Sequence, residues 1–151
     1  MIKKIRITVM IVSILTLSIV GVCLQRSSFI VSINNKKLQH KLRSVDTESV
    51  KLKDVIPFEW DVVYTFPPYS DNKEDIEKII GFKSRHIRVN NINEGMVHLL
   101  FVKNKEVVAS VLGYSSNLGY SIQFPSEITF KQDAIFDVTN TNGIISLSYN
   151  K

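Results

Sequence analysis

The order of apolar and polar positions divides the chain into three parts: an apolar N-terminal run, a polar basic stretch, and a longer part of short alternating segments. The run Ile7–Leu24 holds 18 residues without a charge. At about 1.5 Å per residue, a helix of this length reaches about 27 Å, close to the shortest length that spans a bilayer. The pattern predicts a signal anchor over residues 1–28. Its membrane-embedded positions include Ile7, Val12, Leu15, Val20 and Leu24.

The apolar run allows two other interpretations, a cleaved signal peptide and a lipoprotein signal that ends at Cys23. A cleavable signal needs small residues at the third and first positions before the cut, and no such pair stands out here. Lipidation of Cys23 needs a small residue directly before it, whereas Val22 occupies that position. The anchor is therefore favoured. Basic residues flank the run on both sides, and the closer leading ones favour a cytoplasmic N-terminus with the domain outside.

Residues 29–49 are polar and basic after a short apolar patch at 29–33. Leu38, Leu42 and Val45 fall at helical spacing, so a short amphipathic helix is expected. We interpret the stretch as a basic stalk that holds the domain away from the membrane. The alternative is attraction of its lysines to anionic lipid or to an anionic wall polymer.

A strand, a turn and a helix follow each other between residues 57 and 81. From Glu59 to Phe66 the residues alternate, which predicts a strand with Trp60, Val62, Tyr64 and Phe66 on one core-facing side. The pair Pro67–Pro68 ends it. Asp71 is the expected N-cap of a helix with an apolar stripe of Ile76, Ile79 and Ile80. Gly81 takes the place of the left-handed residue that ends a helix.

The remaining chain predicts a meander of short strands. Residues 96–102 and 106–112 form a hairpin around Lys103-Asn104-Lys105, and further strands are expected at 120–124, 128–130, 134–138 and 144–149. Asn142-Gly143 is a typical two-residue hairpin turn. The expected fold class is α+β: an N-terminal transmembrane helix, then a small antiparallel sheet with one or two short helices in a domain over residues 50–151.

The charge distribution argues against nucleic acid as a partner. The 151-residue chain has a net charge of +5, but residues 46–151 hold 11 basic and 14 acidic residues. A nucleic-acid-binding domain carries its basic surface on the fold itself, and here the excess lies in the N-terminal third. The single cysteine excludes an internal disulfide.

No motif indicates a cofactor, a metal or a nucleotide. Glu59 and Asp61 share one side of the predicted strand, and paired carboxylates can carry acid–base chemistry. His40, His86 and His98 lie far apart and lack the spacing of metal ligands. His98 alternates with Val97 and Leu99, which predicts a partly exposed histidine on the opposite face. Every feature of 57–81 except Asp61 has a structural cause, so Asp61 and Thr65 form the candidate binding surface.

Residues 55–112 resemble a loose group of small bacterial exported or membrane-anchored proteins. The resemblance rests on Phe58-x-Trp60-Asp61-x-Val63-Tyr64, on Pro68-Tyr69, on the helix ending in Gly81, and on the hairpin residues 100–103 and 107–108. It implies a compartment and a fold, without an established activity. Members often begin with a lipoprotein signal, from which this chain departs at Val22.

These observations predict a non-enzymatic binding or accessory domain of the cell envelope, held in the cytoplasmic membrane by a single helix. Its expected partners are the membrane and an envelope protein. One alternative is a small envelope hydrolase with Asp61 or His98 at its centre. Another is an immunity or inhibitor protein directed against a secreted toxin or enzyme.

Overall fold

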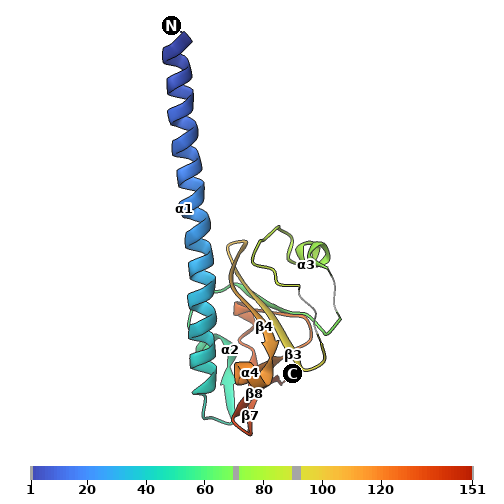
Figure 1. The fold of residues 1–151 in the computed structure, drawn as a ribbon. Coiled ribbons are helices and arrows are strands. Elements are labelled where there is room, and N and C mark those ends of the chain that lie inside the picture. Colours follow the sequence, from blue (N-terminus) through green and yellow to red (C-terminus); the bar gives the residue numbers. More distant parts are fainter. Residues whose placement is uncertain (1, 70–71, 90–92, 151) are drawn as a thin grey trace.

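The computed structural model describes the backbone of residues 2–69, 72–89 and 93–150, with only some of the side chains before residue 25. The described chain is α+β: one long helix, α1 (Ile2–Arg43), beside two four-stranded sheets. In Figure 1 the C-terminal half of α1 lies along the domain, and the N-terminal half projects from it.

The first sheet has the strand order β1-β7-β8-β5 and the second has the order β4-β3-β2-β6. Their bounds are β1 (Ser49–Lys51), β7 (Ile135–Thr141), β8 (Ile144–Tyr149) and β5 (Tyr120–Gln123) in the first. In the second they are β4 (Glu106–Tyr114), β3 (Met96–Lys103), β2 (Val62–Thr65) and β6 (Glu127–Thr129). All pairs are antiparallel except β5 with β8. The prediction of one antiparallel sheet was wrong, because the strands divide between two sheets and one pair is parallel.

Short helices connect these strands: α2 (Leu52–Val55), α3 (Lys73–Ile80), α4 (Ser115–Leu118) and the 3-10 turn η1 (Phe130–Gln132). The N-cap of α3 is Asn72, whose side chain accepts a hydrogen bond from the Asp75 amide at 3.1 Å. The predicted cap, Asp71, lies outside the described residues. Gly81 ends α3 with φ of 81°, as predicted. Ile76 and Ile80 are buried, whereas Ile79 is exposed.

Both predicted hairpin turns are present, although the first comprises only Asn104 and Lys105, because Lys103 still pairs with Glu106 as the last residue of β3. Asn142 and Gly143 have φ of 52° and 80°, and Asn104 and Lys105 have φ of 50° and 59°. Two successive positive φ values define the turn that matches the twist of paired strands. The local chemistry of these turns therefore sets the β7–β8 and β3–β4 pairings.

The central core lies between the sheets and combines residues from both with Leu38 and Leu42 of α1. A second, outer cluster lies on the opposite face of the second sheet, where α3 covers it; its members are Phe66, Ile76, Ile80, Ile87, Leu100 and Val107. Val63 points into the central core, whereas Tyr64 and Phe66 pack in the outer cluster. The prediction of a single core-facing side was wrong, because both faces of β2 are covered. Trp60 precedes β2 and is 2% exposed in the central core.

The C-terminal half of α1 is part of the domain. Val31, Asn34, Leu38 and Leu42 are buried at spacings of three and four residues, so they form one face of the helix. Asn34 Nδ2 donates to the Val108 carbonyl at 2.9 Å. Asn35 donates to the Ser110 carbonyl at 2.8 Å and accepts from the Ser110 amide at 2.9 Å. These bonds satisfy part of the free edge of β4, so one face of residues 31–42 belongs to the core, in contrast to the stalk predicted over residues 29–49.

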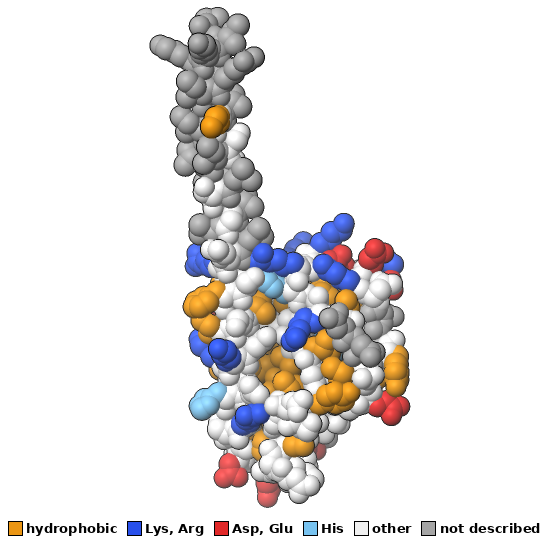
Figure 2. Space-filling view, in the orientation of Figure 1, with side chains coloured by type: hydrophobic (Ala, Val, Ile, Leu, Met, Phe, Trp, Pro, Cys, Tyr) orange, Lys and Arg blue, Asp and Glu red, His pale blue; other side chains and the backbone are white. Residues whose placement is uncertain are grey.

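The apolar run at the N-terminus lies mostly outside the described side chains. Ile7, Leu15, Val20, Leu24 and Cys23 are among those not described, whereas Val12 is exposed. A search of the described residues alone finds no helix long and apolar enough to cross a membrane. Figure 2 shows Lys and Arg side chains gathered on the domain where α1 leaves it.

Candidate functional site

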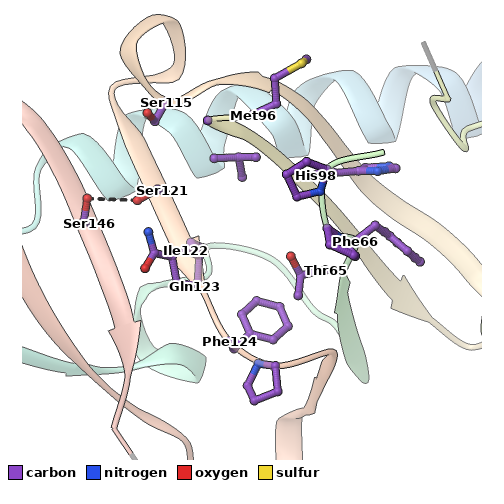
Figure 3. Close-up of a pocket in the computed structure, with 15 residues that line it drawn as sticks. Thr65, Phe66, Met96, His98, Ser115, Ser121, Ile122, Gln123, Phe124 and Ser146 are labelled. Atoms are coloured by element: carbon purple, nitrogen blue, oxygen red, sulfur yellow. Dashed lines mark hydrogen bonds between the residues drawn. The ribbon is translucent and has the colours of Figure 1, made fainter. Parts of the chain in front are cut away.

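A cleft lies where β5 of the first sheet approaches the ends of β2 and β3 in the second. Its volume is about 460 Å³. Residues from both sheets, from the loop after β2 and from the segment after β5 line it. Figure 3 shows these side chains around the opening.

The lining of the cleft is uncharged. Its hydroxyl and amide groups come from Thr65, Ser115, Ser121, Gln123 and Ser146. Aromatic, proline and aliphatic side chains supply the rest, including Phe66, Pro67, Pro68, Met96, Phe124 and Pro125. Among the described lining residues there is no Asp, Glu, Lys or Arg. Such a lining suits an uncharged ligand that offers both hydrogen-bonding and apolar groups.

The parallel pairing of β5 with β8 brings the serine hydroxyls together. Ser121 pairs with Ser146 in the register, and the Ser121 hydroxyl donates to the Ser146 hydroxyl at 3.0 Å. Ser146 remains half-buried, whereas Ser121 is buried. Gln123, at the end of β5, is exposed.

Thr65 belongs to this cleft, but Asp61 does not. Thr65 is the last residue of β2, and its amide donates to the Ser126 carbonyl at 2.8 Å. Asp61 precedes β2 at the other end, four residues or roughly 13 Å away along an extended chain. The structure therefore does not bring Asp61 and Thr65 together as one surface.

Asp61 holds the turn between β3 and β4. Its carboxylate accepts from the Asn104 amide at 2.8 Å and from Lys103 Nζ at 2.9 Å. The Asn104 amide and then Lys103 lower the pKa of the Asp61 carboxyl below its usual range. By binding both residues at this turn, Asp61 has a structural role at the hairpin.

His98 borders the cleft but places its ring in the outer cluster. The ring packs on Phe66 with centroids 4.9 Å apart and is on the face opposite Val97 and Leu99, as the alternation predicts. The side chain is 1% exposed rather than partly exposed, and neither ring nitrogen has a partner among the described residues. Burial, helped by Arg88, lowers the pKa of His98 to about 4. The residue is therefore neutral at physiological pH.

The described side chains contain no group of three or more His, Cys, Asp and Glu that could hold a metal ion. The serines of the cleft escaped sequence reasoning because Ser115, Ser121 and Ser146 belong to three separate elements, α4, β5 and β8. Only the packing of two sheets and the parallel β5–β8 pair bring them together, and neither leaves a local signal in the sequence.

The fold and the cleft define an α+β domain of two sheets with an attached N-terminal helix. Comparison with protein-family models, with curated proteins and with solved structures found no match to the chain. The resemblance of residues 55–112 to a group of exported proteins therefore stays a prediction.

Proposed function

We propose that the chain is a membrane-tethered, non-enzymatic binding domain of the cell envelope, whose cleft takes an uncharged, extended segment of an envelope protein. The observation that carries this proposal is the lining of the cleft, which combines hydroxyl and amide groups with aromatic and proline side chains. Peptide backbone offers the matching donors and acceptors, and small apolar side chains fit between the rings.

The position of the cleft also favours this function. The cleft takes its lining from the start of β3 and from Ser115 just after β4, whereas the β3–β4 turn lies at the other end of both strands. In Figure 1 that turn is beside the projecting part of α1. If residues 7–24 span the membrane, the cleft lies at the end of the domain away from the bilayer, where a partner can reach it.

The geometry favours binding over the hydrolase alternative. Asp61 is held in an ion pair at the hairpin turn, and His98 is enclosed in the outer cluster. A general acid and a general base must reach the same substrate atom within hydrogen-bond distance. These two side chains lie in different environments and do not share the cleft.

The anchor is tested on the tagged full-length protein in cells. We expect it to sediment with membranes at full length and to stay there after carbonate extraction. Protease added to intact protoplasts should digest the domain if it lies outside. Recovery of a shortened soluble form would contradict the anchor, and protection from protease would place the domain in the cytoplasm.

The cleft is tested by capture of envelope proteins with a matched pair of variants. Gln123→Arg places a cation in the cleft, and Thr139→Arg places the same cation at an exposed position of β7. A partner that desolvates an unpaired charge pays several kcal/mol, so capture by Gln123→Arg should fall about tenfold or more. Thr139→Arg should capture the partner as the wild type does. Equal capture by both variants would refute the cleft as the binding site.

A further inference from the structure

Exposed basic side chains lie on α1 where it leaves the domain and on the segment that follows α3. Arg26 belongs to α1, and Lys83 and Arg85 belong to the segment that follows α3. None of the ion pairs among the described residues includes these three side chains. Figure 2 shows cationic groups on this part of the surface. We call Arg26, Lys83 and Arg85 the basic shoulder.

Hydrogen bonds attach the segment after α3 to α1. Arg85 Nη2 donates to the Ser27 hydroxyl at 2.7 Å, and the same hydroxyl lies 3.2 Å from His86 Nε2. Burial and the neighbouring Arg85 lower the pKa of His86, which keeps the ring neutral. These hydrogen bonds therefore fix the position of Arg85 along the axis of α1.

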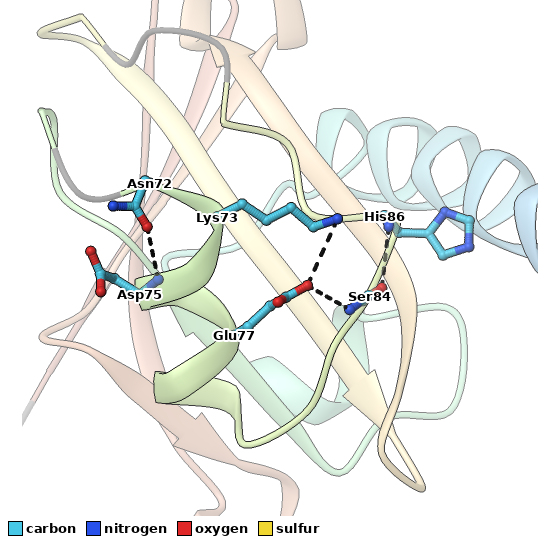
Figure 4. A network of polar contacts seen from close by, with 6 residues as sticks. All are labelled: Asn72, Lys73, Asp75, Glu77, Ser84 and His86. Atoms are coloured by element: carbon cyan, nitrogen blue, oxygen red, sulfur yellow. Dashed lines mark hydrogen bonds and ion pairs between the residues drawn. The ribbon is translucent and has the colours of Figure 1, made fainter.

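The same segment is also held to α3. Figure 4 shows that the Ser84 amide donates to Glu77 Oε1, at 3.1 Å, and that Lys73 Nζ lies 3.7 Å from the same oxygen. Glu77 is therefore already engaged, and the neighbouring acid without an ion pair among the described residues is Glu74. The cations of the shoulder outnumber this remaining acid.

The continuity of α1 fixes the distance between the shoulder and the apolar run. Ser27 is three residues beyond Leu24, which is about 4.5 Å along a helix. The headgroup layer on each side of a bilayer is roughly 5–8 Å thick. Arg85, which touches Ser27, would therefore lie within the headgroups when residues 7–24 span the hydrocarbon core. Lys36 and Lys37 of the predicted stalk lie about 14 Å farther along the helix than Ser27.

Exposed apolar side chains lie at the corresponding level of α1. Phe29 is 66% exposed and Ile30 is 38% exposed. Aromatic and aliphatic side chains beside cations are typical of surfaces that enter the boundary between headgroups and acyl chains. Neither side chain belongs to the two hydrophobic clusters of the domain, and their exposure suits contact with a bilayer.

We propose that the basic shoulder binds anionic phospholipid headgroups of the same bilayer that holds α1, so that the domain rests on the membrane instead of standing away on a stalk. This inference rests on the proposed membrane anchor. It assigns the lipid contact to Arg26, Lys83 and Arg85, and it leaves the lysines of residues 36–41 beside the domain.

The test compares the full chain in two kinds of nanodisc, one of phosphatidylcholine and one with added phosphatidylglycerol. Hydrogen–deuterium exchange of residues 82–89 reports contact with the headgroups. We expect exchange to be slower with phosphatidylglycerol, by about fivefold for each basic side chain held at the surface. Added salt should reduce the difference, because it screens the attraction.

A matched pair of double variants separates the shoulder from general charge. Arg26→Gln with Lys83→Gln removes two shoulder cations without touching the Arg85–Ser27 bond. Lys37→Gln with Lys41→Gln removes two exposed cations farther along α1. The first variant should lose most of the lipid-dependent slowing, and the second should keep it.

The outcomes distinguish this inference from the anchor itself. A chain that fails to enter either nanodisc overturns the proposed anchor. A chain that enters both but exchanges equally in them leaves the anchor intact and overturns the lipid contact. Equal loss in the two double variants would show that net charge acts rather than the shoulder.

Discussion

The docking of α1 on the edge of β4 makes a sharp prediction about Asn35. Its side chain forms hydrogen bonds with both the amide and the carbonyl of Ser110, as a neighbouring strand would. Ser110 is 2% exposed, so water has little access to these groups when the side chain is removed. Asn35→Ala should therefore leave a donor and an acceptor without partners.

The expected loss of stability follows from the free-energy penalty of leaving buried polar groups without hydrogen bonds. Each such group costs about 1–3 kcal/mol, so the free energy of unfolding should fall by about 2–6 kcal/mol in Asn35→Ala. Asn35→Asp keeps the acceptor for the Ser110 amide but sets a carboxylate oxygen against the Ser110 carbonyl oxygen, so it should not restore the lost stability at neutral pH. Asn34→Ala loses the one bond to Val108 and should cost about 1 kcal/mol.

The chain supplies its own probe for this measurement. Trp60 is the only tryptophan and is 2% exposed, so its fluorescence reports unfolding of the central core. Urea titration of the full chain in nanodiscs should show a midpoint lower by about 1–3 M for Asn35→Ala, given a typical urea dependence of about 2 kcal/mol per M. A loss below about 0.5 kcal/mol would refute the reasoning, since the edge of β4 would then be satisfied without the helix.

Three other predictions address the core and the titrating groups. Trp60→Ala should cost about 3–5 kcal/mol in urea titration followed by circular dichroism, whereas Trp60→Phe should cost clearly less because the indole N–H has no partner among the described residues; equal losses would contradict a packing role. Asp61 has a lowered pKa, so its contribution is present above the unfolded pKa and is lost as the pH falls through the folded one. Asp61→Asn should therefore flatten the acid side of the pH–stability curve, and an unchanged acid slope would contradict the clamp. The pKa of His98 is about 4 in the folded chain and about 6.5 in the unfolded chain. Between these pH values the unfolded chain binds one more proton than the folded chain. The free energy of unfolding therefore falls as the pH falls through this range, by up to about 3 kcal/mol. His98→Phe should remove that slope, which denaturation midpoints at several pH values would detect; retention of the slope would assign it to another group.

Local chemistry in the sequence was sufficient to predict the strands β2 to β8 and the helix α3, whereas β1, α2 and α4 were not predicted. Asn142-Gly143 requires two positive φ values and therefore a tight hairpin, and Gly81 ends α3 for a similar reason. The apolar runs 96–102 and 106–112 on either side of Lys103-Asn104-Lys105 predicted the hairpin of β3 and β4. The cap of α3 was misplaced by one residue, since Asp71 and Asn72 offer the same side-chain oxygen.

Long-range contacts decided which elements meet, and the sequence carries no local trace of them. Residue types can alternate in the same way along a strand with one buried face and along a strand with two. Tyr64 and Phe66 were therefore assigned to the central core, whereas they pack in the outer cluster. Leu38 and Leu42 have the spacing of an amphipathic helix, but only the free edge of β4 shows what that helix covers. Thr65 belonged to the predicted surface, but Ser121 and Ser146, which line the same cleft, come from strands far along the chain.

Neighbouring residues are enough to predict the hairpin turns, the strands β2 to β8 and the helix α3, because each depends on local conformational and solvation preferences. The division into two sheets, the uncharged cleft, the clamp at Asp61 and the docking of α1 follow only from contacts between distant parts of the chain. Each of these depends on which surfaces exclude water from one another, and that choice is made over the whole chain at once.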